Sequence, residues 1–497
     1  MRCPLRLCAL GVEKKIVIEW AVIADDLTGC LDSAAPFVRK GRPVRAVLPP
    51  GWDPRNAKSL AQSSAIAIDC ESRTLDSVDA GSAAASAAGK ALSLGARRIY
   101  KKIDSAMRGP WDAEVKSIQP RVGLAIICPA VPTAGRTTRG GIQHINGTAA
   151  PGGDLVRRLG PAARRLALDR VRQGAASIRD ALDKYEAEGA SYVVIDAVEE
   201  GDLRIAAAAA LPRRGTAMFA GAAGFAHALA EHEAPGSPPW VPVSGIPLMI
   251  SASFNPATIA QLAALEEFDG AAILAVPQRA LIAAAESGDA DPGPAAEEQI
   301  ERVRGRALPH YWGSGGLGPA AEEQTERVRG RALPDYWGSE GLGPAAGEQT
   351  ERVRGRALPH YWGSGGPGPG LDEWVERVNA VFASGRSPVL CVEQNGTPER
   401  EDPRLAAGLG RIGACAARQL RPASLVICGG ATAFATIRPL TPVWMEIEGF
   451  ALLNTPAVRL AGGPADGLSV ITKSGGFGGP DTLVQLAARG VENADRG

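Results

Sequence analysis

The chain has 497 residues, which is long for a single domain and indicates two or three. Lysine plus arginine and aspartate plus glutamate both total 54, so the formal net charge is zero and no global field attracts nucleic acid or an anionic membrane. No apolar run approaches the ~20 residues that a membrane-spanning helix needs. An anionic small molecule must therefore be held by local basic side chains or backbone N–H groups.

The first half of the chain has the pattern of an α/β domain. Residues 1–13 precede it and are interpreted as a disordered extension. The run 16–24 is apolar and rich in β-branched residues, as in a buried strand of a parallel sheet. Similar runs alternate with alanine-rich stretches that are typical of helices, such as 79–94 and 203–210. The alternation predicts an N-terminal α/β domain at 14–234.

A proline-rich segment at 235–247 is interpreted as a linker. A second α/β pattern follows it in two pieces, 248–292 and 371–490, with strand-like runs such as 425–428 and 468–471. The sequence therefore predicts two α/β domains with mostly parallel sheets.

Between the two pieces lies a repetitive insertion at 293–370. The nine residues 301–309 recur at 326–334 and 351–359, with a spacing of 25 residues. Each unit offers at most a short helix before proline and glycine, so the insertion is expected to be disordered. The alternative is a binding arm that uses its tyrosine–tryptophan pairs and arginine clusters.

Two adjacent carboxylates, Asp25 and Asp26, follow the first predicted strand and precede Thr28 and Gly29. Ligands of α/β sheets bind at the carboxyl ends of strands, where such groups could orient or deprotonate a hydroxyl. The alternative is that Asp26 or Thr28 caps a helix that starts near Cys30.

Basic and acidic side chains also follow other predicted strands. Lys102 and Arg108 could grip a substrate carboxylate, and Asp104 between them could accept a hydroxyl proton. Arg73 and Arg136 follow two further strands in the same way. Loops from one sheet edge thus present Arg, Lys and Asp, which fits an anionic small-molecule site better than a surface salt-bridge cluster.

The second domain offers two glycine-rich loops after strands. Gly429 and Gly430 precede a predicted helix, whose N-terminus and backbone N–H groups suit a phosphate. The loop 472–479 contains four glycines and Lys473. Neither is a Walker A loop, because Gly-x-x-x-x-Gly-Lys-Ser/Thr is absent. Two such loops in one domain indicate a nucleotide site, and phosphoryl transfer normally uses Mg²⁺.

Taken together, these motifs resemble the four-carbon acid sugar kinase family, whose members phosphorylate D-threonate, D-erythronate or 3-oxo-tetronate. The resemblance covers about 14–290 and 371–490. The matching pieces stand in the family's order: 24–29 with Asp32, 71–73, 101–105 with 108–109, 129–132 with 135–136, 196–197 with 202–203, 221–224, 429–432 and 473–478.

The resemblance implies that the N-terminal domain binds the sugar acid, that the C-terminal domain binds ATP, and that the active site lies in the interdomain cleft. It names two catalytic candidates, Asp26 and Asp104, and leaves open which is the base. Substrate-binding residues would be Asp25, Arg73, Lys102, Ser105, Arg108 and Arg136. Nucleotide-binding residues would be Ser253, Gly429, Gly430, Thr432, Lys473, Gly475, Gly476 and Gly478. Mg²⁺ is expected with ATP, without assigned ligands.

The leading hypothesis is therefore an ATP-dependent cytoplasmic kinase that phosphorylates the terminal hydroxyl of a four-carbon sugar acid. Its partners would be the sugar acid and ATP, without nucleic acid or membrane, and the pattern allows a homodimer. Two alternatives come from other classes. Departures from the family at Ala222, Ala252 and Ala431 suit a non-catalytic sugar-acid sensor, and the repeats suit an interaction protein.

Overall fold

A computed structural model describes residues 17–39, 42–48, 54–213, 217–234, 236–286, 370–393 and 402–494. The extension predicted at 1–13 lies outside the described residues, as does the insertion predicted at 293–370 except for its last residue. The described residues belong to one compact unit. Within them, no helix is long and apolar enough to cross a membrane, and the six cysteines form no disulfide.

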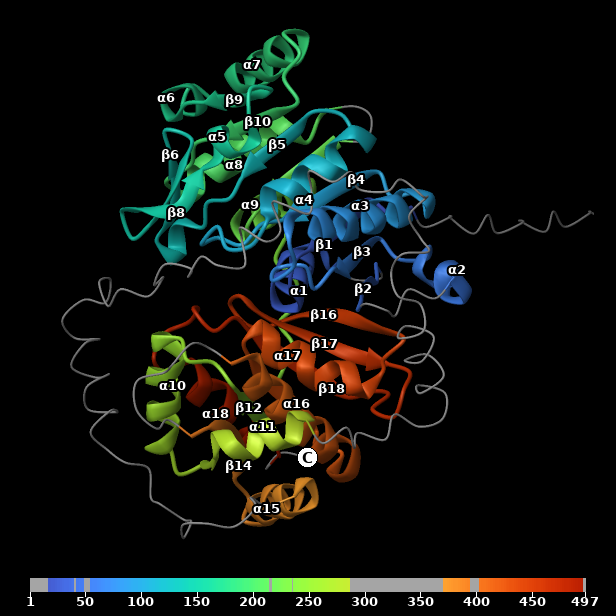
Figure 1. The fold of residues 1–497 in the computed structure, drawn as a ribbon, viewed down its shortest axis with the longest axis vertical. Coiled ribbons are helices and arrows are strands. Elements are labelled where there is room, and N and C mark those ends of the chain that lie inside the picture. The colour runs from blue at the N-terminus through green and yellow to red at the C-terminus, as the bar shows by residue number, and fades with distance from the viewer. Residues whose placement is uncertain are drawn as a thin grey trace, which may run out of the picture. The chain divides into compact units, whose positions relative to one another are not determined.

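A run of parallel strands forms the N-terminal half of the main sheet, in the order β2-β3-β1-β4-β11-β5-β10-β9 (Figure 1). The next three strands in the chain after β5 form a separate, small antiparallel sheet, β6-β7-β8. The strands are β1 (Trp20–Ala24), β2 (Val44–Val47), β3 (Ala65–Asp69), β4 (Arg98–Lys102), β5 (Ala125–Cys128), β6 (Arg136–Arg139), β7 (Ile142–Ile145), β8 (Thr148–Asp154), β9 (Ala163–Leu166), β10 (Tyr192–Ile195) and β11 (Ala217–Gly221).

Helices connect these strands. They are α1 (Leu27–Ala34), α2 (Ala57–Leu60), α3 (Ser77–Ser93), α4 (Trp111–Ile118), α5 (Leu155–Leu159), α6 (Leu168–Val171), α7 (Ala175–Ala187), α8 (Glu200–Ala210) and α9 (Ala223–Glu233). Helices α3 and α4 lie side by side (Figure 1). The alanine-rich stretches predicted as helices at 79–94 and 203–210 correspond to α3 and α8.

Strand β1 explains why the run 16–24 is almost continuously apolar. All five of its residues are buried. Val22 packs into the hydrophobic cluster that includes α1 and α9, while Ala21 and Ile23 pack into the cluster that includes α3 and α4. Successive side chains of a strand point to opposite faces, so a sheet covered on both faces needs apolar residues at every position.

The C-terminal half adds a second parallel run, β13-β14-β12-β15-β18, followed by the antiparallel pair β17-β16. Its strands are β12 (Pro247–Ser251), β13 (Ala271–Val276), β14 (Ser387–Val392), β15 (Ser424–Cys428), β16 (Trp444–Leu452), β17 (Thr455–Ala461) and β18 (Ser469–Lys473). Its helices are α10 (Pro256–Glu266), α11 (Gln278–Glu286), α15 (Leu371–Ala383), α16 (Pro403–Leu420), α17 (Gly430–Ile437) and α18 (Thr482–Ala494). The predicted α/β class with mostly parallel strands is confirmed.

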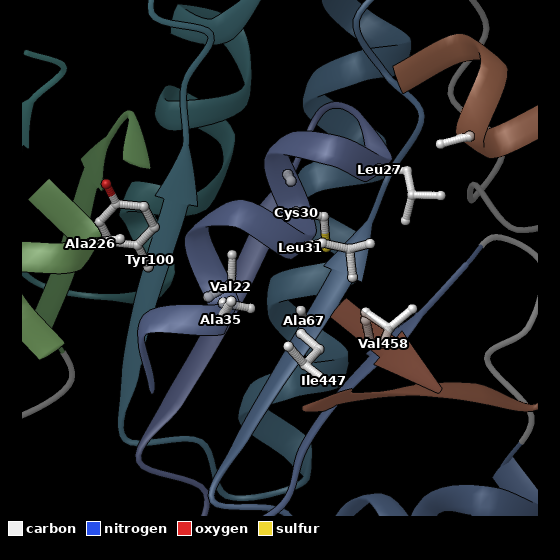
Figure 2. Packing of buried hydrophobic residues seen from close by; sticks show 14 of the residues in the cluster. Val22, Leu27, Cys30, Leu31, Ala35, Ala67, Tyr100, Ala226, Ile447 and Val458 are labelled. Carbon is white, nitrogen blue, oxygen red and sulfur yellow. The ribbon is translucent and has the colours of Figure 1, made fainter. Parts of the chain in front are cut away.

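The two parallel runs join into one 15-stranded sheet because β16 pairs antiparallel with β2. The core also continues across this junction. Leu27 and Leu31 of α1 share a hydrophobic cluster with Ile447 of β16 and Val458 of β17, and Figure 2 shows these side chains facing one another. Helix α1, which follows the Asp25-Asp26 pair, is thus held by both halves of the sheet.

The segment predicted as a linker also contacts the sheet. Trp240 forms a bridge with Phe450 of β16, and the backbone N–H of Val241 donates to the carbonyl of Phe450 at 2.9 Å. The segment therefore pairs with the part of β16 that extends beyond its pairing with β2, which involves only Met445–Ile447.

Candidate active site

Asp25 and Asp26 connect β1 to α1. Asp26 is the N-cap of this helix, because its Oδ1 accepts the backbone N–H of Gly29 at 3.0 Å and its backbone is extended. Its Oδ2 accepts the hydroxyl of Thr28 at 3.0 Å. The helix cap that the sequence offered as an alternative is therefore present. Capping occupies Oδ1 and leaves Oδ2 for contacts with other loops.

Arg73, in the loop after β3, binds both carboxylates. Its Nε and Nη2 donate to the two oxygens of Asp25 at 2.7 and 3.1 Å, and its Nη1 donates to Oδ2 of Asp26 at 2.8 Å. The Asp25 carbonyl accepts the backbone N–H of Arg73 at 3.2 Å. Burial acts to raise the pKa of Asp25, but attraction to Arg73 and then to Lys101 outweighs it and keeps this pKa below its usual value.

Asp104, in the loop after β4, is held by Arg108. Nε and Nη2 of Arg108 donate to Oδ2 and Oδ1 at 2.9 and 2.8 Å, and the backbone N–H groups of Ala106 and Arg108 donate to Oδ2 at 3.2 Å. Arg73 Nη2 lies 3.7 Å from Oδ1. Although burial opposes ionisation, Arg73 and Arg108 hold the pKa of Asp104 far below its usual range. Arg73 thus links all three aspartates.

Lys102 is 6% exposed, and its Nζ donates to the carbonyl of Ile103 at 2.8 Å. It lies against α1, because a Cβ atom at Gly29 would be 3.1 Å from Nζ. No carboxylate among the described residues lies within ion-pair distance of this ammonium. Lys102 therefore retains N–H groups that can bind a ligand beside Asp26.

The loop that carries Ser105 is fastened to the small sheet. The Ser105 carbonyl accepts Nε2 of Gln143, a fully buried side chain of β7, at 3.1 Å. Arg136, the first residue of β6, donates from Nη1 to the carbonyl of Ala134 at 3.3 Å. Burial lowers the pKa of Arg136, with a smaller opposing attraction from Asp104. The residues predicted to bind the sugar acid, which is the acceptor of the phosphoryl group, therefore lie near one another. Arg136 is at the periphery of this group.

In the C-terminal half, which is predicted to bind the nucleotide, β12, β15 and β18 are parallel neighbours. Their carboxyl ends therefore lie at the same sheet edge. The predicted residues follow these ends. Gly429 has a φ of +93° and donates its N–H to the carbonyl of Lys473 at 2.8 Å. Thr432 Oγ1 accepts the N–H of Ala252 at 3.3 Å. The loops approach closely, since a Cβ atom at Gly475 would lie 2.6 Å from Ser253 Oγ.

The loop after β18 is held by neutral side chains of α10 and by its own lysine. Gln261 Nε2 donates to the carbonyls of Phe477, Gly478 and Gly479 at 3.2, 3.2 and 2.9 Å. Lys473 is 1% exposed, and its Nζ donates to the carbonyls of Ser474 and Phe477, both at 2.8 Å. Burial lowers its pKa. Its ammonium therefore fastens the glycine loop.

Gly476 and Gly478 complete this loop. A Cβ atom at Gly476 would lie 3.5 Å from Nδ2 of Asn255, which is the N-cap of α10, and Gly478 has a φ of +89°. Only glycine adopts that φ without strain. The loop is thus shaped by glycine and leaves backbone groups near the N-cap of α10.

The two groups of loops meet at the N-terminus of α17. A Cβ atom at Gly430 would clash with Asp26 Oδ2 and lie 3.1 Å from Thr28 Oγ1. Helices α1 and α17 are in contact. A helix N-terminus carries a partial positive charge and unpaired N–H groups. The nucleotide-side glycine turn therefore opens directly onto the Asp26 carboxylate.

Both cofactors expected from the sequence can be compared with these residues. The unpaired N–H groups at α17 and the glycine turns fit a polyphosphate. For a metal, the described residues contain no group of three or more acidic, histidine or cysteine side chains placed to hold an ion. Mg²⁺ often binds through substrate phosphates and only one or two carboxylates. The described protein residues by themselves do not form a metal cage.

Several buried or half-buried groups behind these loops received no role from the sequence: Asp32, Glu71 and Lys101 stand in the matching pieces, and Glu114 does not. Asp32 and Glu71 each have a pKa raised to about 7, first of all by burial. Lys101 and Glu114 form an ion pair at 3.0 Å with exposed fractions of 0 and 1%. The burial of Glu114 could have been predicted from the sequence, because Glu114 lies on the apolar helix face formed by Trp111, Val115 and Ile118.

Two family models match parts of the chain. A model of a sugar-binding N-terminal domain matches residues 20–229, and a model of a nucleotide-binding C-terminal domain matches residues 371–483. The chain is 35% identical to a D-threonate kinase of Cupriavidus necator over 303 residues, which are 57% of this chain and 71% of that protein. It belongs to the four-carbon acid sugar kinase family.

Other members of the family match over shorter or more divergent stretches. A D-threonate kinase of Salmonella typhimurium is 33% identical over 228 residues, covering 42% of this chain and 52% of the relative. A D-erythronate kinase of Heliobacterium modesticaldum is 29% identical over 312 residues, covering 58% of this chain and 67% of the relative. Different sugar acids thus occur in the names of its kinase relatives.

Solved structures support the fold of this family member. A Salmonella typhimurium LT2 protein superposes with a TM-score of 0.62 at 17% identity, covering 95% of this chain and 98% of that one. A Haemophilus influenzae protein has a TM-score of 0.59, also at 17% identity, with 94 and 99% covered. At such low identity, these similarities concern the fold alone.

Proposed function

We propose that this protein is an ATP-dependent kinase that phosphorylates the terminal hydroxyl of a four-carbon sugar acid, such as threonate, erythronate or 3-oxo-tetronate. The observation that carries the proposal is the contact of Gly430, at the start of α17, with the Asp26 carboxylate. It brings a phosphate-binding type of turn next to a group that can accept a hydroxyl proton. The kinase relatives support the same reaction class.

In the proposed complex, the sugar acid carboxylate binds the cations around Asp104. Lys102 has unused N–H donors, and the Arg108 side chain is 53% exposed although it also pairs with Asp104. Arg136 would contribute a third cation at the edge of the group. A guanidinium binds a carboxylate with two parallel hydrogen bonds, which fixes the orientation of a small acid. Ser105 and Asp25 would contact its hydroxyls.

Asp26 is proposed as the base in preference to Asp104. An ionised carboxylate accepts about four hydrogen bonds. Four donors already fill Asp104, from Arg108 and the backbone, whereas Asp26 receives three, from Gly29, Thr28 and Arg73. By this count Asp26 keeps one acceptor position, which is on Oδ1, while its Oδ2 is the oxygen that lies next to Gly430. The role of Asp104 would then be to orient Arg108.

ATP would place its phosphates on the backbone N–H groups of α17 and of the glycine turns that contain Gly475 and Gly476. Ser253 and Thr432 would shape these glycine turns. Lys473 would hold the loop after β18 through its hydrogen bonds to the carbonyls of Ser474 and Phe477. When bound, Mg²⁺ would neutralise phosphate charge during transfer. The residues of the chain orient the acceptor hydroxyl toward the phosphate, accept its proton at Asp26 and exclude water.

The test is a coupled assay of ADP release with Mg-ATP and a panel of D- and L-threonate, D- and L-erythronate and 3-oxo-tetronate. We expect one of these acids to be phosphorylated, and Asp26→Asn to reduce kcat roughly 10²- to 10⁴-fold. The matched control is Asp79→Asn at an exposed position of α3. Sugar acid binding by calorimetry without turnover would contradict a kinase and favour the sensor. Full turnover by Asp26→Asn would refute the base assignment.

A further inference from the structure

A buried ion pair lies behind the acceptor site and joins two of its loops. Lys101 is the residue of β4 directly before Lys102, and Glu114 is in α4. Their Nζ and Oε2 atoms are 3.0 Å apart. The other carboxylate oxygen of Glu114, Oε1, accepts the hydroxyl of Ser72, which directly precedes Arg73. One carboxylate therefore contacts both the loop after β3 and the end of β4.

Each of these contacts continues into a proposed acceptor residue. The backbone N–H of Ser72 donates to the carbonyl of Asp25 at 3.0 Å, next to the corresponding bond from Arg73. Lys101 Nζ donates to the carbonyl of Lys102 at 2.7 Å. A shift of Glu114 would thus move Arg73 relative to Lys102. Lys102 ends β4 and Arg73 is in the loop after β3, and these two strands are separated in the sheet by β1.

The network is closed to water. Lys101 is fully buried, Ser72 is fully buried and Glu114 is 1% exposed. A buried ion pair is weak evidence for stability, because the loss of hydration offsets most of the attraction, and an apolar pair of similar volume is often as stable. Such a pair is therefore better explained by a requirement for defined geometry than by a gain in stability.

We propose that Glu114 and Lys101 are positioning residues for the acceptor site, which set the distance between Arg73 and Lys102 and thereby the affinity for the sugar acid. This inference rests on the proposed function, since it assumes that Arg73 and Lys102 belong to the sugar-acid site. Neither residue contacts the proposed substrate, so both act through their neighbours. Supporting residues of this kind hold a site within the tolerance that the chemistry needs.

The test is the double variant Lys101→Met with Glu114→Gln. It removes both charges at similar volume, and the amide oxygen still accepts the Ser72 hydroxyl. We expect the melting temperature to change little, and kcat/KM for the sugar acid to fall about 10- to 100-fold through a higher KM. KM for ATP should stay within about twofold, because the nucleotide loops are on other strands. Glu114→Gln alone should be less stable than the double variant, because it leaves a buried ammonium unpaired.

The matched control removes an ion pair from the same helix. Lys116 and Asp112 of α4 are paired at 3.1 Å, with exposed fractions of 40 and 19%, and both also bind Arg158 of α5. Asp112→Asn with Lys116→Met should leave KM for the sugar acid unchanged. An unchanged KM in the Lys101/Glu114 double variant, or an equal rise in KM for ATP, would overturn the inference.

Calorimetric titration with the best sugar acid separates this inference from the kinase proposal. If the wild type binds the acid without turnover, the kinase proposal fails, and a tenfold weaker Kd in the double variant still supports the positioning role. An equal Kd in both proteins overturns it. If the wild type neither binds nor phosphorylates any of the acids, both proposals are overturned.

Discussion

The loops proposed to bind the acceptor and the glycine-rich loops proposed to bind the nucleotide are held in place by different physical means. On the acceptor side, the fixed groups are charged: Arg73 binds Asp25 and Asp26, and Arg108 binds Asp104. In the glycine-rich loops, Gln261, Thr258 and the ammonium of Lys473 bind backbone carbonyls instead of carboxylates, and positive-φ glycines shape the turns. The comparison indicates that the first region depends on charge and the second on backbone shape.

The largest effect should follow from removal of the central charge on the acceptor side. Arg73→Met leaves Asp25 and Asp26 buried without their partner, which costs about 3–5 kcal/mol of unfolding free energy. Urea unfolding followed by circular dichroism measures this change. Arg97→Met is the control, because the Arg97 side chain is 62% exposed in its pair with Glu19. Equal losses in the two variants would contradict the special role of charge in the acceptor loops.

A change of shape on the nucleotide side should act on activity more than on stability. Gly430→Ala introduces a Cβ atom that clashes with Asp26 Oδ2, a group already fixed by the cap and by Arg73. We expect kcat/KM to fall about 10- to 100-fold, because the clash displaces the Asp26 carboxylate, and a misplacement of about 1 Å can cost on the order of 10²-fold in rate. Steady-state kinetics with both substrates measures the loss. Gly201→Ala in the first turn of α8 has open space and should be neutral. Full activity of Gly430→Ala would rule out a tight contact at Asp26.

A dependence of stability on pH is expected from the N-terminal half. Burial raises the pKa of Asp32 and of Glu71 to about 7, whereas unfolded carboxyl groups titrate near 4. The folded protein therefore holds these protons more tightly, and this contribution to stability is lost as the pH rises from about 4 to 7. Between pH 5 and 7 each of these two groups should lower the unfolding free energy by about 2 kcal/mol, so the expected fall is at most about 4 kcal/mol.

The double variant Asp32→Asn with Glu71→Gln should show a weaker dependence over the same range. Urea unfolding at pH 5, 6, 7 and 8 compares the two proteins. A parallel decline in both would mean that other groups carry the pH dependence.

Much of the fold could be predicted because buried parallel strands have a simple pattern. Runs at 425–428 and 468–471 correspond to β15 and β18, which are buried on both faces. β2 and the β16–β17 hairpin were not among the predicted strands. β2 has only four residues, with Arg45 among them, and β16 alternates between buried and half-buried positions. Such strands are defined by their neighbours rather than by their own composition.

The sequence by itself determined which chemical groups follow the strands, since strand ends and glycine turns are local features. It therefore identified the Asp25-Asp26 pair, the cations of the acceptor loops and the two glycine loops. Only the tertiary structure decided which charges neutralise one another. Arg73 is 47 residues from Asp26 in sequence yet binds it, and Glu114 reaches Ser72 across 42 residues. Contacts over such separations depend on strand order and helix packing, which local spacing does not specify.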